Sequence, residues 1–298
     1  MISVSLPDFC LAQFMRCVGE ILEMPAEEVR AKEIQHILTR LGEERDHPRT
    51  QLFVQCCRIF LSSVVNANGN FEVNGEAALV ESLAGRGLKT ILDVGANVGS
   101  WSSMFRKFHP DAAIHAFEIV PDTFSILKEN LDSDNKVVLN PIGLSDFEGD
   151  LTMYTFSENN EVATYLEYPH EGTRSAIEAK CTKGDIYLEE FGINHVDFLK
   201  LDVEGAEPKV LAGFSSAFDQ DAISLVQFEY GKANILTRFL LHDYYEFFQG
   251  RNFAVGKLYP NRVAFKDYTF EDEDFMGYNY IACTKKRPDL IKHLSSFA

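Results

Sequence analysis

The chain has 298 residues, 46% of them hydrophobic and 24 of them Phe, which is enough apolar material for one large domain or for one domain with an appendage. It carries 45 acidic against 28 basic residues, a formal net charge of −17, and this balance argues against nucleic acid and anionic membranes as partners because both are bound through Lys and Arg. No apolar run is long enough to span a bilayer, no signal-like segment begins the chain and the six cysteines form no C-x-x-C pair, so we expect a cytoplasmic protein with reduced thiols.

The first 70 residues predict an N-terminal helical extension. Residues 9–22 are largely apolar, and residues 26–41 place Val, Ile and Leu at helical spacing after a proline. Residues 51–65 predict a third helix. Such apolar faces most often pack on the rest of the chain, and the alternative is that they form a homodimer interface. The remainder, residues 71–298, is expected to form one domain.

Strands and helices alternate from Thr90 onward. The strands are predicted at residues 90–95, 113–119, 136–142, 196–203 and 223–229. The helices are predicted near residues 98–108, 121–131, 207–214 and 238–250. This alternation is typical of an α/β fold in which a parallel, doubly wound sheet carries helices on both faces. Short added strands at 151–156 and 175–182 interrupt it, and two strands with no helix between them, at 253–259 and 278–284, predict an antiparallel hairpin at the end of the sheet.

The most informative segment runs from Thr90 to Trp101 and reads TILDVGANVGSW. It predicts a buried strand that leads through a glycine turn into a helix, whose first N–H groups are free to meet a ligand. The next strand ends near an acid, Glu118. Because an acid about 20 residues beyond such a turn can hold both hydroxyls of a ribose, the pair of strands predicts a nucleoside-containing cofactor.

The spacing of the turn favours one cofactor over another. It reads D-x-G-x-N-x-G instead of the G-x-G-x-x-G of dinucleotide folds, and Asp93 would repel a phosphate but suits a ligand with an ammonium or sulfonium group. We therefore predict S-adenosylmethionine, against the simpler alternative of a plain tight turn. The candidate cofactor-binding residues are Asp93, Gly95, Ala96, Asn97, Gly99, Glu118, Ile119, Gly143, Leu144, Ser145 and Asp202. Those of the first turn are assigned to the methionine end, Glu118 to the ribose and the loop after the third strand to the adenine.

Charged side chains gather at the ends of the fourth and fifth predicted strands. Lys200 and Asp202 share one face of a strand, Glu204 follows it, and Gln227 and Glu229 share one face of the next. Burying charges without partners is costly, so the candidate catalytic residues are Asp202, Glu204, Lys200 and Glu229. A structural ion pair of Lys200 is the alternative. The acids could also gather Mg²⁺ or Ca²⁺, but no spacing enforces it, so a divalent metal stays open and is not predicted.

Taken together, these motifs resemble the FkbM family of methyltransferases. The matching pieces are NGE at 74–76, DVGANVG at 93–99, AFE at 116–118, FLKLDVEGAE at 198–207 and QFEYG at 227–231. The resemblance covers about residues 70–285 and implies the class I methyltransferase fold, a Rossmann-like doubly wound sheet ending in an antiparallel strand. It also implies S-adenosylmethionine-dependent O-methylation of a hydroxyl on a small molecule, natural product or sugar. In one departure, Glu118 is followed by Ile-Val-Pro where the family commonly has Pro directly, but the acid itself remains.

The expected reaction is an in-line transfer of methyl to an acceptor oxygen. Asp202 and Glu204 are the candidate bases for the hydroxyl proton, and Lys200 or a metal would stabilise the developing alkoxide. Three alternatives stay open. They are transfer to nitrogen or to a carboxylate, a cofactor-binding scaffold without catalysis, and a nicotinamide oxidoreductase, which Asp93 and the terminal hairpin disfavour.

Overall fold

The computed structural model describes residue 39 and residues 42–156, 159–164 and 174–297, and it divides the chain into two compact units at Val65. In the first unit, helix α3 (Pro48–Val64) confirms the helix predicted at 51–65 and begins three residues earlier. The two helices predicted at 9–22 and 26–41 lie outside the described residues. Within the described chain, no helix combines the length and apolar character needed to cross a bilayer.

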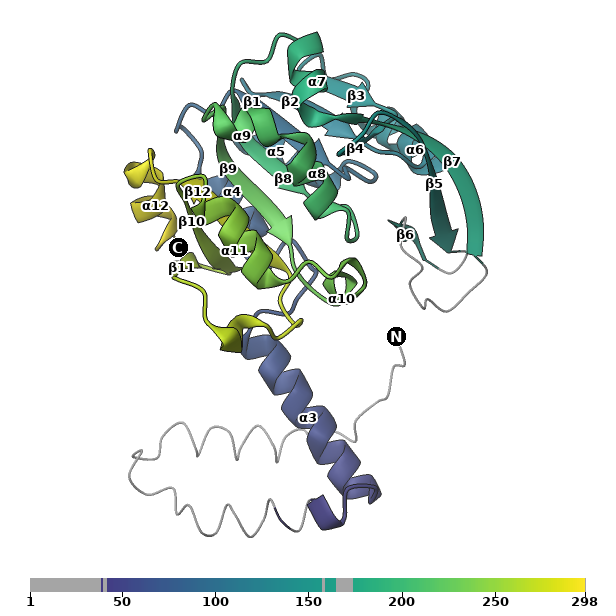
Figure 1. The fold of residues 1–298 in the computed structure, drawn as a ribbon, viewed down its shortest axis with the longest axis vertical. Coiled ribbons are helices and arrows are strands. Elements are labelled where there is room, and N and C mark those ends of the chain that lie inside the picture. The colour runs from purple at the N-terminus through teal and green to yellow at the C-terminus, as the bar shows by residue number, and fades with distance from the viewer. Residues whose placement is uncertain (1–38, 40–41, 157–158, 165–173, 298) are drawn as a thin grey trace. The chain divides into compact units, whose positions relative to one another are not determined.

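Eight strands of the second unit form one sheet: β1 (Thr90–Val94), β2 (Ala113–Phe117), β3 (Val137–Asn140), β8 (Val196–Leu201), β9 (Ile223–Glu229), β10 (Phe253–Tyr259), β11 (Arg262–Phe265) and β12 (Asn279–Thr284). Their order across the sheet is β11-β10-β12-β9-β8-β1-β2-β3 (Figure 1). The five neighbouring strands β9, β8, β1, β2 and β3 run parallel, and β12 is antiparallel to β9. The predicted doubly wound sheet that ends in an antiparallel strand is confirmed.

The end of the sheet differs from the predicted hairpin in one respect. β10 and β12 pair antiparallel, as expected, with Phe253 opposite Thr284. The tight hairpin, however, joins β10 to β11, a four-residue strand that the sequence pattern did not reveal. The chain then returns to place β12 between β10 and β9. A strand of four residues carries too short an alternation to stand out in sequence.

Helices cover both faces of this sheet, because alternate strand residues are buried in opposite directions. Ile91 packs with α4 (Glu76–Ser82), α5 (Ser100–Phe108) and α12 (Pro288–Leu294). The next residue, Leu92, packs with α7 (Gly184–Glu190), α8 (Glu207–Gly213), α9 (Ser215–Asp219) and α11 (Leu241–Gln249) on the other face. The predicted helices near 98–108, 121–131, 207–214 and 238–250 are confirmed as α5, α6 (Pro121–Leu131), α8 and α11. A short helix, α10 (Ala233–Thr237), follows β9.

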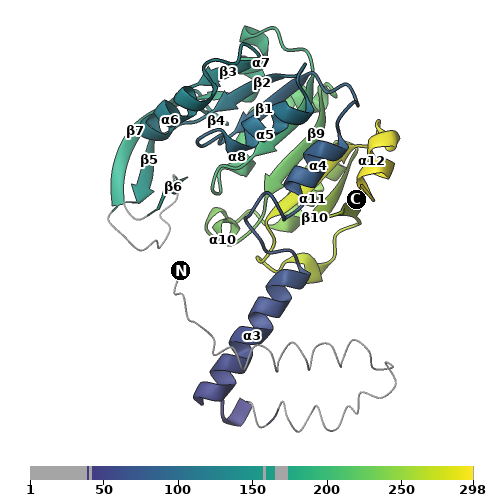
Figure 2. The ribbon, with the colours of Figure 1, turned by 180° about the vertical axis from the view of Figure 1, so that it is seen from behind.

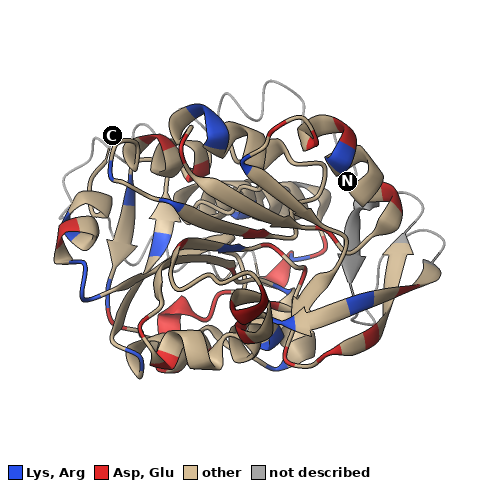
Figure 3. Cartoon of the chain, turned by 90° about the horizontal axis from the view of Figure 1, so that it is seen from above, with Lys and Arg blue, Asp and Glu red and all other residues tan. Residues whose placement is uncertain are grey.

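The strands predicted at 151–156 and 175–182 exist but form a second sheet. It contains β4 (Gly143–Ser145), β5 (Gly149–Phe156), β6 (Asn159–Thr164) and β7 (Arg174–Lys183), in the order β4-β7-β5-β6. β5 and β7 pair antiparallel and extend past α6, as Figure 2 shows from behind. The predicted adenine loop is partly β4, whose Ser145 pairs with Lys183 of β7. Figure 3 shows from above that acidic residues are spread over many helices, strands and loops.

Candidate active site

The loop between β1 and α5 holds its backbone close to the end of the neighbouring strand. Gly95 and Gly99 have positive φ angles of 83° and 86°, and Asn97 lies between them at 49°. The N–H groups of Gly95 and Ala96 donate to the carbonyl oxygen of Phe117 at 3.0 and 2.8 Å, which ties the loop to β2. A Cβ on Gly99 would meet leucine side chains of α6. Gly99 thus allows the loop to pack against that helix.

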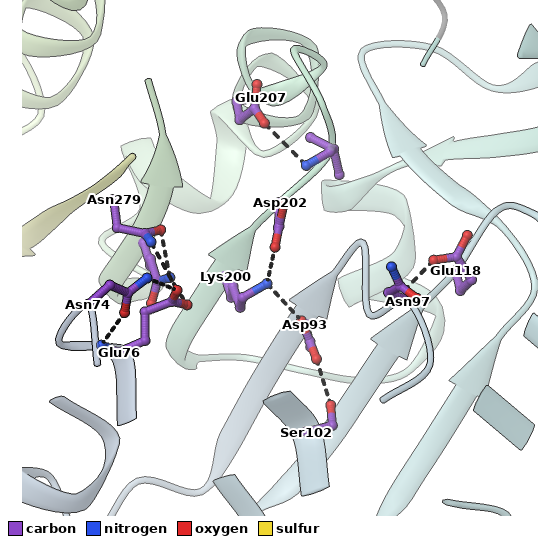
Figure 4. A network of polar contacts seen from close by, with 12 residues as sticks. Asn74, Glu76, Asp93, Asn97, Ser102, Glu118, Lys200, Asp202, Glu207 and Asn279 are labelled. Atoms are coloured by element: carbon purple, nitrogen blue, oxygen red, sulfur yellow. Dashed lines mark hydrogen bonds and ion pairs between the residues drawn. The ribbon is translucent and has the colours of Figure 1, made fainter. Parts of the chain in front are cut away.

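Glu118, directly after β2, reaches back to this loop. Its side chain is buried, and one carboxylate oxygen accepts the N–H group of Asn97 at 2.9 Å (Figure 4). The other carboxylate oxygen accepts the N–H group of Val120 at 2.8 Å. Burial raises the pKa of Glu118, while these backbone N–H groups act to lower it. Each carboxylate oxygen has a second lone pair, so Glu118 retains the capacity to accept hydrogen bonds from a pair of hydroxyls.

A cleft opens beyond the carboxyl ends of β1, β2 and β8 and encloses about 880 Å³, its open mouth included. One part of its lining is apolar and comes from Phe117, Ile119, Ile142, Leu144, Leu151 and Met153. The polar part comes from Asn97, Glu118, Ser145, Asp202, Glu204 and Lys209. In open α/β sheets this edge is where ligands bind, and the cleft has the apolar walls and few polar groups of a small-molecule site.

The structure brings most of the predicted site residues to this cleft. Eight of the eleven predicted cofactor residues line it: Gly95, Asn97, Glu118, Ile119, Gly143, Leu144, Ser145 and Asp202. The other three, Asp93, Ala96 and Gly99, are buried behind its surface. Of the four predicted catalytic residues, Asp202 and Glu204 line the cleft, whereas Lys200 and Glu229 lie outside its lining.

Lys200 is held between two acids at the edge of the cleft. It lies in register with Asp93 on the neighbouring strand, and their exposed fractions are only 4% and 0%. Its Nζ atom is 2.8 Å from Oδ2 of Asp202 and 3.7 Å from Oδ1 of Asp93, whose other oxygen accepts the Ser102 hydroxyl at 2.7 Å (Figure 4). Burial acts to lower the pKa of Lys200, but the attraction of Asp202, Asp93 and Glu76 outweighs it and raises the pKa. Lys200 is therefore a cation at neutral pH, and it forms the ion pair with Asp202 that the sequence analysis gave as the structural alternative.

Three further carboxyl groups lie around Asp202 and retain protons to unusually high pH. Burial, reinforced by the charge of Asp202, raises the pKa of Glu204 to about 7. Glu207 is buried in the first turn of α8, where its carboxylate accepts the N–H of Val203 at 3.1 Å, and burial raises its pKa to about 7 as well. Burial and these neighbouring acids raise the pKa of Glu229 well above its usual value. Groups that titrate near neutral pH are suited to accept and release protons during a reaction.

Comparison with known proteins places the chain in a family. A family model described as the methyltransferase FkbM domain matches residues 93–255, which include the β1 turn, Glu118, Lys200, Asp202 and Glu229. The chain belongs to the FkbM methyltransferase family. The FkbM resemblance in the sequence is thereby confirmed, and with it the class I methyltransferase architecture of the main sheet.

Two curated methyltransferases are similar to this FkbM domain in sequence. The chain is 25% identical over 136 residues to the 2-O-methyltransferase NoeI of Sinorhizobium fredii, covering 41% of the chain and 56% of NoeI. It is 30% identical over 140 residues to the hexuronic acid methyltransferase AglP of Haloferax volcanii, covering 47% of the chain and 55% of AglP. The chain thus spans about half the length of the curated relatives it matches.

Among solved structures, the plantazolicin methyltransferase BpumL aligns with 85% of the chain and 98% of its own length, at 9% identity and a TM-score of 0.41. The fold class of the FkbM domain follows from its own strand order, in which the antiparallel β12 lies next to β9.

Sequence reasoning missed several lining residues of the FkbM domain, among them Leu151, Met153, Cys181 and Lys209. The first three belong to β5 and β7 of the second sheet. Leu151 and Met153 alternate on one face of a strand, so the pattern shows that this face is buried. The pattern does not show which part of the protein covers this face, because the position of the second sheet beside the cleft depends on the tertiary structure.

The acids at the cleft of the FkbM domain do not converge as metal ligands do. Within the described residues, one group of three or more such side chains has ligand atoms within 4.8 Å of one another, and it consists of His242, Asp243 and Glu246. That group lies on α11, away from the cleft lining, and Glu246 is exposed. Asp202, Glu204 and Glu229 remain candidates for proton transfer instead.

Proposed function

We propose that this FkbM domain binds S-adenosylmethionine in its cleft and transfers the methyl group to a hydroxyl oxygen of a small-molecule or glycan acceptor. The observation that carries the proposal is the meeting, in one cleft, of the β1 glycine turn, the ribose acid Glu118 and the acids Asp202 and Glu204. The first two features suit a nucleoside, and the last two suit a cationic donor next to an acceptor that must lose a proton.

The residues present fit the cofactor. Glu118 has lone pairs left for the two ribose hydroxyls, and the apolar wall that includes Leu144 and Met153 suits a purine ring. Asp202 and Glu204 give the other end of the cleft a negative potential that attracts a sulfonium. Lys209 is the one basic side chain among the lining residues, which fits a ligand without a pyrophosphate better than a dinucleotide.

When bound, S-adenosylmethionine would supply an electrophilic methyl group. The work of this chain is to align the acceptor oxygen and to take its proton. Glu204 is the proposed base, because it lines the cleft and its pKa of about 7 allows it to accept a proton at neutral pH. Lys200 lies behind Asp202, and its Nζ atom is 2.8 Å from Oδ2 of Asp202, so this ion pair orients the Asp202 side chain at the wall of the cleft.

The charges around the cleft bear on the acceptor. Asp202, Glu204, Glu207 and Glu229 lie near one another; Lys200 pairs with Asp202, and Lys209 is the basic side chain in the cleft lining. A carboxylate acceptor would be repelled from such a site, whereas a neutral hydroxyl would not. We therefore favour the hydroxyl of a sugar or another neutral molecule, in keeping with the 2-O-methyltransferase among the relatives, over transfer to a carboxylate.

The proposal is tested by calorimetric titration of the purified protein with S-adenosylhomocysteine, with NAD as the control ligand. Binding of S-adenosylhomocysteine alone supports the cofactor assignment. A screen of neutral and acidic sugars with a donor labelled in its methyl group then tests transfer. Folded protein that does not bind S-adenosylhomocysteine would overturn the proposal, and binding without transfer to any acceptor would favour the scaffold alternative.

A further inference from the structure

Four buried polar side chains form a cluster beside the candidate active site. The cluster consists of Asn74, Glu76, Gln227 and Asn279, each at most 7% exposed. Oε1 of Glu76 accepts the amide N–H groups of Asn74 at 2.8 Å and Asn279 at 3.0 Å, and Oε2 accepts that of Gln227 at 2.6 Å (Figure 4). Three neutral donors, one from the loop before α4 and one each from β9 and β12, thus hold one buried carboxylate. We call these four residues the Glu76 cluster.

The backbone fixes Glu76 in this place. The preceding Gly75 has a φ of 108°, and a Cβ there would overlap the carbonyl oxygen of Tyr259. The N–H of Glu76 also donates to Oδ1 of Asn74 at 2.9 Å. The Asn-Gly-Glu motif therefore has a structural reason for each residue, and Glu76 is buried outside the lining of the cleft.

The Glu76 cluster lies next to Lys200 in the sheet. Asp93, Lys200 and Gln227 are in register across β1, β8 and β9, so their side chains form a row on one face. The amide nitrogen of Gln227 donates to both Glu76 and Asn279, at 2.6 and 2.9 Å. Its two N–H groups are thereby used, and the amide oxygen lies on the other side of the group, buried and without a hydrogen-bond partner within the described residues.

Two other buried polar atoms near Lys200 also lack a hydrogen-bond partner within the described residues. They are Oδ1 of Asp93 and Nε1 of Trp101. The Trp101 ring lies 5.6 Å from Nζ of Lys200. Oδ1 of Asp93 lies 3.7 Å from Nζ of Lys200, so this oxygen and the Trp101 ring both lie close to the Lys200 ammonium group.

The charges that face Lys200 come from three elements. They are Asp93 on β1, Asp202 just after β8 and Glu76 at the start of α4. Asp202 alone is within hydrogen-bond distance of Nζ, and its side chain is 40% exposed. Lys200 therefore lies between a member of the buried Glu76 cluster, Gln227, which is its neighbour in register, and a carboxylate in the wall of the cleft.

We infer that Glu76 is a positioning residue for the proposed methyl transfer: it fixes the amide of Gln227 and holds Lys200 charged and hydrogen-bonded to Asp202. The inference rests on the proposed function for its catalytic consequence, but the link from Glu76 to Lys200 does not. A Gln at position 76 would remove the charge and place an amide N–H against the N–H groups that now converge there. The neighbouring amide of Gln227 would have to turn over, and a donor would then face the Lys200 side of the row.

The first measurement follows Lys200 directly and needs no activity. In protein with lysine labelled with ¹³C at Cε, the Lys200 signal is assigned by its loss in Lys200→Met and is followed by NMR as pH rises. Lys200 of the parent should stay protonated up to the highest pH at which the protein remains folded, whereas in Glu76→Gln its deprotonation should begin within that range. The control Glu81→Gln changes an exposed residue of the same helix and should behave like the parent. Unchanged titration in folded Glu76→Gln protein would overturn the inference, whatever the outcome for the proposed function.

The second measurement compares kinetic constants with the acceptor found by the screen. Glu76→Gln should lower kcat about tenfold, with a change of less than about twofold in S-adenosylhomocysteine affinity, because the cluster does not touch the cleft. The rate should also begin to fall at high pH where the parent rate does not. Glu76→Asp keeps the charge and should recover part of kcat. Equal losses in Glu76→Gln and Glu76→Asp, with the pH profile of the parent, would show a merely structural role.

A further variant covers the case in which Glu76→Gln does not fold. Gln227→Met keeps the length of the side chain and the charge of Glu76, which retains the donors of Asn74 and Asn279. It should lower kcat through lost orientation, while Lys200 stays protonated over the same pH range as in the parent. A kcat equal to that of the parent would contradict the positioning role of Gln227 and of the cluster.

Discussion

Gly95 in the β1 turn packs directly against the backbone of Asp202 at the end of β8. A Cβ added to Gly95 would overlap the carbonyl oxygen of Asp202, and the N–H of Asp202 donates to the carbonyl oxygen of Val94 at 3.0 Å. The predicted cofactor turn and the predicted catalytic acid therefore form one rigid junction. Any change at position 95 acts on both halves of the site.

The Gly95→Ala variant should lose most of its affinity for S-adenosylhomocysteine. The alanine would need a φ of 83°, and its methyl group would push β8 and the β1 turn apart. Left-handed backbone alone costs about 1–2 kcal/mol for a residue with a Cβ. Gly87→Ala is the matched control, because Gly87 has a φ of 76° but open space around it. Both variants should be less stable in denaturant titrations, but only Gly95→Ala should bind ligand at least about tenfold more weakly.

The Glu118→Gln variant should bind S-adenosylhomocysteine about tenfold more weakly or worse, which calorimetry would measure. The amide nitrogen would replace one of the two oxygens that now accept the N–H groups of Asn97 and Val120, and it would weaken the hydrogen bonds to the ribose hydroxyls. Glu129→Gln, an exposed position on α6, is the control. Unchanged affinity in Glu118→Gln would remove this acid from the cofactor site.

The variants Asp202→Asn and Glu204→Gln test the proposed proton transfer. Both residues line the cleft, and each replacement keeps the size of the side chain while removing the base. We expect transfer to fall by at least about a hundredfold, within the usual contribution of a general base. Affinity for S-adenosylhomocysteine should stay close to that of the parent. Full activity in both variants would place the base elsewhere.

The pH dependence of the rate follows from the pKa of Glu204, about 7. A base acts only when it is ionised, so kcat/KM should rise as the pH increases through about 7 and level off above it. The profile of the parent enzyme, measured with buffers of constant ionic strength, checks this directly. A rate that is constant through neutral pH, or that falls as pH rises, would argue against Glu204 as the base.

Stability should depend on pH in the opposite sense to that of an ordinary salt-bridged acid. Burial raises the pKa of Glu207 from its usual 4.5 to about 7, so the folded state binds this proton more tightly than the unfolded state. The free energy of unfolding should therefore fall as pH rises from about 4.5 to about 7. Glu207→Gln, which stays neutral, should be about 1 kcal/mol more stable than the parent above this range.

Urea denaturation at several pH values measures this effect. Glu189→Gln, an exposed change on α7, should follow the parent at every pH. Glu204 has a similar pKa, so part of the slope should remain in Glu207→Gln. An identical slope in the parent and in Glu207→Gln would show that Glu207 does not hold its proton in the folded state.

Local patterns were sufficient for the elements of the main sheet. β1 and β9 carry apolar residues on both faces, α6 begins at Pro121, and the alternation of strand and helix leaves one class of topology. The same patterns placed Asp202 and Glu204 at the carboxyl end of a buried strand, which is the ligand-binding edge of such sheets. These features depend on neighbours in sequence, and the sequence alone therefore determined them.

The tertiary structure decided which residues face the cleft and which lie behind it. Asp93 was predicted to meet the cofactor, and the structure buries its carboxylate against Ser102 and near Lys200, since the row across β1 and β8 points to the face covered by α4, α5 and α12. The Glu76 cluster joins positions 76, 227 and 279, and the cleft takes Leu151 and Met153 from a second sheet. Such contacts join residues far apart in the chain, and their geometry depends on how whole elements pack. Periodicity predicts that a side chain is buried, but the residues that cover it depend on the tertiary structure.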